Sequence, residues 1–282
     1  MILIDLSQCI YSIVLREPTA KMNFAVSKGM IYTTLLSFKR KFESQFGEPI
    51  LAADSNCGYW RTDVFPHYKA ARRASKKTST RTDWSKIEPF VTDMHQELKE
   101  CMPWKFIQVP GAEADDVIGC LGMRYGSAPT LILSSDKDYA QLQLAPGVKQ
   151  YSSVKKQWIT VDDPVRALQE LILRGDVEDG IPNLFSDDDT FVVKGKRQKQ
   201  MTEAKVKDYF DNMDARIKEN QKRYDQNRQL IDFTQIPRNI RKAIYTEYEK
   251  APRGSVKKLY DCFIRARLPL LVSDVESFRI RG

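Results

Sequence analysis

Short apolar runs separated by longer amphipathic segments dominate the first half of this chain. The runs have the length and composition of buried strands, and they are Ile2–Ile4, Pro49–Ala53, Lys105–Val109 and Thr130–Leu133. Between them lie segments with apolar residues at helical spacing, 24–46, 84–98 and 112–125. Strands that alternate with helices in this way predict an α/β fold, with a central, mostly parallel sheet and helices on both faces.

The character of the chain changes beyond residue 162. Residues 165–173 are helical by pattern, residues 194–228 are polar and rich in Lys and Arg, and residues 240–248 and 256–266 are helical again. We therefore predict two domains, an α/β domain over residues 1–180 and a smaller helical domain over residues 181–282.

Composition narrows the classes of function. The 282 residues carry 45 Lys and Arg against 37 Asp and Glu, and the net charge of +8 suits a polyanionic partner such as nucleic acid. The apolar opening is interrupted by Asp5, and no run approaches the roughly 18 apolar residues of a membrane span, so we expect no signal peptide and no membrane partner. The five cysteines form no C-x-x-C pair, which predicts reduced thiols in a cytosolic compartment.

Acidic residues follow the predicted strands. In an open parallel sheet, binding sites form outside the carboxyl ends of the strands. Four acids fall at or just after such ends, Asp5, Asp54, Asp136 and Asp138. Any one of them could be a turn residue, but turn chemistry does not explain their joint placement. The stretch Glu113–Asp116 adds three acids at the start of a predicted helix, more than the helix dipole alone requires.

A further acidic pair, Asp176 and Asp179, lies in a turn bounded by glycines. Because the chain has only two histidines, its carboxylates favour Mg²⁺ or Mn²⁺ over softer metals. Two such ions about 4 Å apart are the usual device for phosphodiester hydrolysis. The candidate ligands are Asp5, Asp54, Glu113, Asp115, Asp116, Asp136, Asp138, Asp176 and Asp179. Within the helical stretch we favour Asp115 as the direct ligand, with Glu113 and Asp116 nearer to bound water.

Residues 59–82 form a basic segment with interleaved aromatic residues. Lys69 and Arg72 are three positions apart, which predicts one helical face that could clamp a phosphate at the acidic centre. Tyr59, Trp60 and Tyr68 suit base stacking, although Trp60 suits the core equally well. Lys76, Lys77 and Arg81 fit a solvated helix better than a catalytic role. The candidate nucleic-acid contacts are Arg61, Lys69, Arg72, Arg73, Lys76, Lys77, Lys194, Lys196 and Arg197.

Other features carry less weight. The acidic run Asp187–Asp189 lies outside the strand-end pattern and predicts a solvated loop, and His95 lies within a helix as a surface or core residue. The chain has no Walker A loop, no G-x-G-x-x-G fingerprint and no G-x-S-x-G elbow, which excludes the commoner nucleotide-binding and acyl-transfer classes.

Taken in order, these motifs resemble the 5′ nuclease (flap endonuclease) superfamily, and most closely its T-even-type phage ribonucleases H. The stretches that carry the resemblance are LeuIleAspLeuSer (3–7), AlaAspSerAsnCysGlyTyrTrpArg (53–61), TyrLysAlaAlaArgArg (68–73), GluAlaAspAsp (113–116), SerSerAspLysAspTyr (134–139), GlyAspValGluAspGlyIlePro (175–182), LeuIleAspPheThrGlnIlePro (230–237) and AlaProArgGly (251–254). They span nearly the whole chain.

The resemblance implies a PIN-like nuclease core and assigns roles by position. A first Mg²⁺ would be surrounded by Asp5, Asp54, Glu113, Asp115, Asp116 and Asp136, and a second by Asp138, Asp176 and Asp179. Lys69 and Arg72 would contact the scissile phosphate with Tyr68 beside them, so the catalytic residues would be Lys69, Arg72, Tyr68 and Asp115. The basic segment would be an arch through which a 5′ single strand passes.

The resemblance also implies an activity and partners. Members of the superfamily are magnesium-dependent 5′-to-3′ exonucleases and flap endonucleases on DNA and RNA–DNA hybrids, including forked duplexes, and Mn²⁺ is expected to substitute. The phage enzymes remove RNA primers during DNA replication, alongside a single-strand-binding protein and a sliding clamp. We expect a monomer in the cytoplasm of the bacterial host.

One element departs from the family pattern. Members commonly follow the second acidic pair with a glycine-rich hairpin, in a helix–three-turn–helix that grips duplex DNA and a potassium ion. Here Gly180-Ile181-Pro182 is followed by Asn183-Leu184-Phe185, without the later glycines. The basic residues Lys194, Lys196, Arg197 and Lys199 are the alternative source of backbone contacts, through charge alone.

Two other functions remain open. A PIN-type ribonuclease has a similar acidic sheet edge, but such domains are about half this length and lack the Lys69/Arg72 segment. A non-catalytic protein that binds branched DNA is the alternative from another class. The full set of carboxylates disfavours it, because a pure binder would gain affinity for phosphate by losing them.

Overall fold

The computed structural model describes residues 1–282 except 17, 251, 281 and 282. Its centre is a six-stranded sheet in the order β3-β2-β1-β4-β5-β6, parallel except for the last strand, which is antiparallel to β5. The strands are β1 (Ile2–Asp5), β2 (Pro49–Ala52), β3 (Lys105–Ile107), β4 (Thr130–Leu133), β5 (Val148–Ser152) and β6 (Gln157–Ile159). The predicted α/β class and mostly parallel sheet are confirmed.

The helices of the first 180 residues are α1 (Leu6–Val14), α2 (Phe24–Phe46), α3 (Trp60–Val64), α4 (Ala70–Thr78), α5 (Trp84–Cys101), α6 (Ala114–Tyr125) and α7 (Pro164–Arg174). The later helices are α8 (Glu203–Asp211), α9 (Met213–Glu219), α10 (Gln221–Ile231), α11 (Arg238–Glu249), α12 (Val256–Arg265) and α13 (Pro269–Ser273). Short 3₁₀ turns lie at η1 (Thr19–Lys21), η2 (Lys137–Leu144), η3 (Phe233–Gln235) and η4 (Val275–Phe278).

The periodic segments 24–46, 84–98 and 112–125 became helices close to their predicted bounds. The two strands β5 and β6 were not predicted, because Lys149 and Gln157 interrupt their apolar pattern with exposed polar residues. Helices α8, α9 and α10 were also not predicted individually. Helix α9 buries no residue, and α8 and α10 bury only a few, so the sequence shows no wide apolar stripe there.

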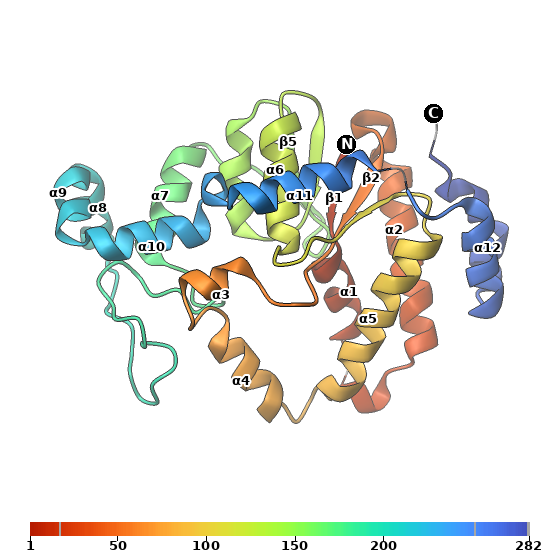
Figure 1. Ribbon diagram of the computed structural model, residues 1–282, viewed down its shortest axis with the longest axis horizontal. Helices are drawn as coiled ribbons and strands as arrows, with labels where there is room; N and C mark the ends of the chain where they lie inside the picture. Colours follow the sequence, from red (N-terminus) through yellow and green to blue (C-terminus); the bar gives the residue numbers. More distant parts are fainter. Residues whose placement is uncertain (17, 251, 281–282) are drawn as a thin grey trace.

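Alternate residues of the strands supply two cores, one on each face of the sheet. Ile2 and Ile4 join a cluster with α1, α2, α5 and α12, while Leu3 joins a cluster with α6, η3 and α11 (Figure 1). A third cluster joins α7, α8 and α10 to Phe65 and Tyr68. The chain beyond residue 180 therefore packs on both faces of the sheet, and the division into domains near residue 180 stays a prediction.

Two cysteines depart from the prediction of reduced thiols. Cys101 of α5 and Cys262 of α12 are joined by a disulfide inside the first core, although 161 positions separate them in the chain. Spacing along the sequence cannot reveal such a pair, because only the packing of α12 on α5 brings the two residues together. No helix in the part of the chain that the structure describes is long and apolar enough to cross a membrane.

Candidate active site

Asp5 ends β1 and begins α1, so its carboxylate lies at the carboxyl edge of the sheet. It is 7% exposed, and it accepts hydrogen bonds from the backbone of Gln8 at 2.9 Å and from the hydroxyl of Ser134 at 3.0 Å. Burial raises the pKa of Asp5 to about 7, and the negative charges of Asp54 and Asp136 add to this shift. The three carboxylates are therefore close enough to repel one another.

Asp54 lies two residues after the end of β2, and its carboxylate contacts both α1 and α6 at the carboxyl edge of the sheet. Its oxygens accept hydrogen bonds from the Ser7 hydroxyl of α1 at 2.6 Å and from the backbone of Ala114, at the start of α6, at 2.8 Å. Strand β2 pairs directly with β1, which places Asp54 next to Asp5 along the edge.

Asp115 and Asp136 complete this first acidic group. Asp115 lies in the first turn of α6 and accepts a hydrogen bond from the buried hydroxyl of Tyr139. Asp136 caps η2 by accepting from the backbone of Asp138 at 2.9 Å. Burial raises the pKa of Asp115 well above its ordinary value, and the charges of Asp136 and Asp5 raise it further. Asp5, Asp54, Asp115 and Asp136 are hereafter the first acidic group.

Asp138, Asp176 and Asp179 form a second acidic group beside the first. Burial raises the pKa of Asp138 well above its ordinary value, followed by the charges of Asp136, Asp176 and Asp179. One carboxylate oxygen of Asp138 is buried without a hydrogen-bond partner. Asp176 and Ile181 exchange two backbone hydrogen bonds, which closes the turn that holds Asp179, and Lys137 lies 3.1 Å from Asp176.

Glu113 and Asp116 have different surroundings from the first acidic group. Glu113 accepts hydrogen bonds from Arg61 at 2.9 Å and Tyr68 at 2.7 Å, and it pairs with Lys69. Asp116 pairs with Arg61 at 2.9 Å and accepts from the indole of Trp60 at 3.0 Å. Although burial alone would raise the pKa of Glu113, Lys69 and Arg61 lower it below its ordinary value.

These contacts correct two expectations. Arg61, predicted to contact nucleic acid, is 3% exposed and neutralises Glu113 and Asp116 instead. Tyr68, predicted as a stacking surface, is buried, and its hydroxyl contacts Glu113. Trp60, for which a core position was the equal alternative, is buried and donates to Asp116. Tyr59 is half-buried, with Lys69 lying 5.5 Å from its ring centre.

Lys69 does not share a helical face with Arg72. It precedes α4 with a left-handed backbone (φ 54°), and its N–H donates to the carbonyl oxygen of Asp179 at 2.7 Å. Its ammonium pairs with Glu113 and lies 3.6 Å from a carboxylate oxygen of Asp179. Arg72, on α4, approaches the same Asp179 to 3.7 Å with its side chain about half exposed. Both cations therefore approach Asp179, Lys69 from the residue before α4 and Arg72 from the helix itself.

The raised pKa of Lys69 limits the catalytic roles that this residue can have. Burial alone would lower its pKa, but the charges of Glu113 and Asp179 raise it well above its ordinary value. A lysine that stays protonated throughout the physiological range can attract a phosphate but cannot act as a general base.

Within the predicted arch, the helix that follows Lys69 is mostly exposed. Helix α4 buries no residue and extends away from the sheet before the chain turns back into α5 (Figure 1). Lys76 is tied to α5 by an ion pair with Glu88 at 3.0 Å and lies 4.3 Å from the ring centre of Trp84. Arg73 donates to the carbonyl of Tyr68 at 2.7 Å, and Lys77 is exposed.

The segment 182–200 replaces the expected glycine hairpin with a loop closed around a buried asparagine. The Asn183 side chain donates to the carbonyl of Lys199 at 2.7 Å, and its N–H donates to Gln198 at 2.8 Å. Lys196, predicted to contact nucleic acid, is exposed and pairs with Asp187 at 2.8 Å and with Asp189, and its contact with nucleic acid stays a prediction. Lys194 and Arg197 are exposed. Nothing in the sequence around Asn183 indicates that this residue is buried and closes the loop.

Two features that were given little weight lie where they were expected. Asp187 and Asp188 are exposed in the loop, where Arg223 pairs with Asp188 at 2.5 Å. His95 lies within α5 against the ring of Phe106.

In the part of the chain that the structure describes, the acidic groups do not by themselves supply a complete set of ligands for one metal ion. Within residues 1–16, 18–250 and 252–280, no three Asp, Glu, His or Cys side chains converge closely enough to ligate one ion together. Mg²⁺ keeps several waters and commonly takes only one or two carboxylates. The unpartnered oxygen of Asp138 and the mutual repulsion within the first acidic group are what a nearby cation would relieve.

Comparisons with known proteins agree with the fold and the order of the motifs. The family model described as 5′-3′ exonuclease, N-terminal resolvase-like domain, matches residues 1–169, and that of T4 RNase H, C terminal, matches residues 166–278. Ribonuclease H of Enterobacteria phage T4 is 30% identical over 98% of this chain and 95% of its own length. A 5′-3′ exonuclease of Mycobacterium tuberculosis is 29% identical over 44% of this chain and 46% of its own.

Solved structures share the fold at lower identity. A phage T5 5′-exonuclease with bound zinc superposes with a TM-score of 0.62 at 16% identity, covering 89% of this chain and 99% of that one. The T5 flap endonuclease, in a complex with DNA and metal ions, gives 0.59 at 15% identity and covers 94% of this chain and 98% of that one. The resemblance inferred from the motifs is confirmed: the chain belongs to the 5′-3′ exonuclease family of nucleases, with a C-terminal region of the T4 RNase H type.

Proposed function

We propose that the protein is a magnesium-dependent 5′-to-3′ exonuclease and flap endonuclease that hydrolyses phosphodiester bonds in DNA and RNA–DNA hybrids. In this proposal it removes RNA primers during phage DNA replication, as a monomer in the host cytoplasm, alongside a single-strand-binding protein and a sliding clamp. One observation carries the proposal. The first acidic group gathers carboxylates from the ends of β1, β2 and β4 and from α6 at one edge, beside the cations Lys69 and Arg72.

The carboxylates divide into two candidate sets. The first acidic group would hold one ion, and Asp138, Asp176 and Asp179 a second, with Mn²⁺ as a substitute for Mg²⁺. Such ions, when bound, lower the pKa of a water and stabilise the leaving oxygen. Glu113 and Asp116 now have a positioning role in the proposal, because Arg61, Lys69 and Trp60 occupy their oxygens.

The basic side chains would bind the scissile phosphate. Lys69 is held in place by its backbone contact to Asp179, and its charge is permanent, so it can stabilise the negative charge that develops on the phosphate. Arg72 is more exposed and would contact the phosphate as it enters. Tyr68 is buried, and its hydroxyl lies within hydrogen-bonding distance of Glu113 at 2.7 Å and Asp179 at 2.8 Å, so it would position those two carboxylates without touching the substrate.

The test is cleavage of a 5′-labelled flap duplex and of a 5′-recessed RNA–DNA hybrid, each with Mg²⁺ or with chelator. We expect 5′-directed products only with Mg²⁺, and none from Asp115→Asn. A wild-type protein that binds the fork tightly in Mg²⁺ without cutting it would contradict the proposal and would favour the non-catalytic binder instead.

A further inference from the structure

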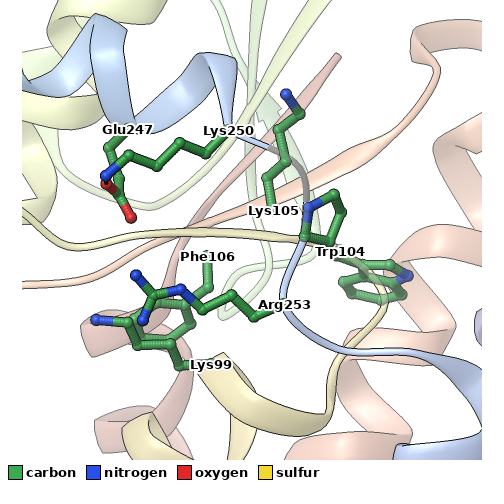
Figure 2. Close-up of a pocket in the computed structure, with 8 residues that line it drawn as sticks. Lys99, Trp104, Lys105, Phe106, Glu247, Lys250 and Arg253 are labelled. Carbon is green, nitrogen blue, oxygen red and sulfur yellow. Dashed lines mark hydrogen bonds and ion pairs between the residues drawn. The ribbon is translucent and has the colours of Figure 1, made fainter.

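A small basic pocket lies at the opposite end of the sheet from the acidic groups. Its walls come from the last turn of α5, the start of β3 and the residues after α11 (Figure 2). Four cations line it, Lys99, Lys105, Lys250 and Arg253, and we call this site the basic pocket. Lys105 begins β3, whereas the acidic groups lie beyond the carboxyl ends of the strands, so the two sites are separate.

Positive charge exceeds negative charge around the basic pocket. Glu247 is the one acid that lines it, and it pairs with Lys250. Lys105 donates to the carbonyl of Tyr248 rather than to a carboxylate. In the described part of the chain neither Lys99 nor Arg253 has a carboxylate partner, and both line the pocket with Phe106 (Figure 2). Like charges brought together in this way favour an anion between them.

The chain holds this arrangement in place through Gly254. A Cβ added there would lie 2.0 Å from the carbonyl oxygen of Met102, so only glycine allows the loop to pack this closely on the end of α5. The next residue, Ser255, donates its N–H to the carbonyl of Cys101 at 3.2 Å. This contact fixes Arg253 beside Lys99. The stretch AlaProArgGly belongs to the family resemblance, and the acidic groups give it no role.

Helix α11 connects the two sites. Its start lies near the acidic edge, because a Cβ on Gly111, two residues before Glu113, would be 3.5 Å from the Ile240 side chain. Its end lies at the basic pocket, about 18 Å away for a helix of this length. Arg238 and Lys242 are exposed four residues apart on one face of α11, and the exposed Lys250 directly follows its last residue.

We infer that the basic pocket binds a backbone phosphate of nucleic acid that runs from the acidic edge along α11. The inference rests on the proposed function for the identity of its ligand. The space at the floor of the pocket is about 20 Å³, enough for one water-sized group such as a phosphate oxygen and too small for a base. The site would therefore recognise the backbone charge of the nucleic acid and not its base sequence, and it would add affinity for a longer substrate.

The test measures equilibrium binding to two forked substrates. One has an arm long enough to run from the acidic edge along α11 to the basic pocket, and the other has an arm too short to reach it. Chelator is present, so that no cleavage takes place. For Lys99→Gln/Arg253→Gln we expect about tenfold weaker binding of the long-arm fork, and a salt dependence smaller by about 0.9 per lost contact. Binding of the short-arm fork should not change. The control, Lys149→Gln/Lys155→Gln, removes two exposed cations near the opposite edge of the sheet and should leave both affinities unchanged.

Equal losses on both forks, or equal losses in the control, would overturn the inference. Titration with inorganic phosphate separates a free anion site from a backbone site. Phosphate binding that depends on Lys99 and Arg253, together with an unchanged long-arm affinity in the double variant, would also overturn it. A wild-type protein that fails to cleave any substrate would refute the proposed function, whereas the binding comparison in chelator would still decide the role of the basic pocket.

Discussion

The backbone N–H of Lys69 donates to the carbonyl oxygen of Asp179 at 2.7 Å, while the Lys69 ammonium lies 3.6 Å from the Asp179 carboxylate. This double contact joins the base of the arch to the turn that holds the second acidic group. Gly180 makes the contact possible, since a Cβ there would lie 3.3 Å from the carbonyl oxygen of His67. Lys69 and the second acidic group therefore form one structural unit.

We expect Lys69→Ala to slow cleavage at saturating substrate by about 10²–10³-fold, with little change in affinity. Lys69 is buried against Glu113, and in the proposed function its charge acts at the reacting phosphate rather than at the substrate surface. Single-turnover rates and equilibrium binding separate the two effects. Lys77→Ala, which removes an exposed cation of α4, is the control and should keep the rate. A loss confined to affinity would remove Lys69 from the catalytic residues.

Gly180→Ala should destabilise the protein and slow cleavage together. Gly180 has φ 74° and Gly195 has φ 85°, so alanine is strained at both positions, by roughly 1 kcal/mol. Only Gly180 has neighbours within 4 Å, the backbone atoms of His67 and Lys69. Thermal unfolding and cleavage of the two variants should therefore differ. Gly195→Ala is expected to keep full activity, and equal activity in both variants would contradict the coupling of this turn to Lys69.

Arg61→Met should cost about 3–5 kcal/mol of the free energy of unfolding. The change leaves Asp116 buried without its cation and removes one of the two cations that neutralise Glu113, while the carbonyl of Leu230 loses its donor. Urea unfolding measures the effect. Arg72→Met is the matched control, because its partners lie 3.7 Å away or more and its side chain is half exposed. A loss below about 1 kcal/mol for Arg61→Met would show that the buried network is not needed for stability.

Addition of Mg²⁺ should raise the midpoint of thermal unfolding, because a bound cation neutralises the repelling carboxylates of the acidic groups. Asp138→Asn should reduce this increase, since the variant removes a carboxylate whose one oxygen is buried without a partner. Asp187→Asn, an exposed acid that pairs with Lys196, is the control and should show the full increase. An undiminished increase in Asp138→Asn would remove Asp138 from the candidate ligands.

The contribution of His95 to stability should fall as the pH drops below about 6.5, whereas the buried carboxyls Asp5, Asp115 and Asp138, whose pKa values are raised, act in the opposite direction. Burial lowers the pKa of His95, and its Nε2 is buried without a partner against Phe106. The unfolded chain then takes up a proton at a higher pH than the folded one, so acid favours unfolding between the unfolded and the folded pKa. Unfolding in urea across this range should show that the wild type loses stability relative to His95→Gln as the pH falls. An unchanged dependence would assign the effect to other groups.

The acidic edge could be predicted from the sequence because each strand and its following acid are local features. Asp5, Asp54 and Asp136 follow runs that are recognisable as strands, and parallel pairing brings the ends of such strands to one edge. The segment 24–46 was predicted as a helix for the same local reason, since its apolar spacing matches the helical period.

The partners of charged side chains could not be predicted in this way. Arg61 and Lys69 are both basic residues near an aromatic, and nothing in their local sequence distinguishes a buried ion pair from an exposed nucleic-acid contact. Arg61 is buried because α10 passes over it and supplies the carbonyl of Leu230, 169 positions later in the chain. The basic pocket likewise requires α5, β3 and α11 to meet.

The sequence by itself determined the α/β alternation, the acids at the strand ends and membership of the nuclease family, since periodicity and motif order are properties of short stretches. Only the tertiary structure decided that Glu113 and Asp116 face cations, that Cys101 meets Cys262 and that Lys69 rests on Asp179. Each of these contacts closes a long loop, and its existence depends on how whole helices pack. The packing follows from the burial of apolar faces that are distant in the chain.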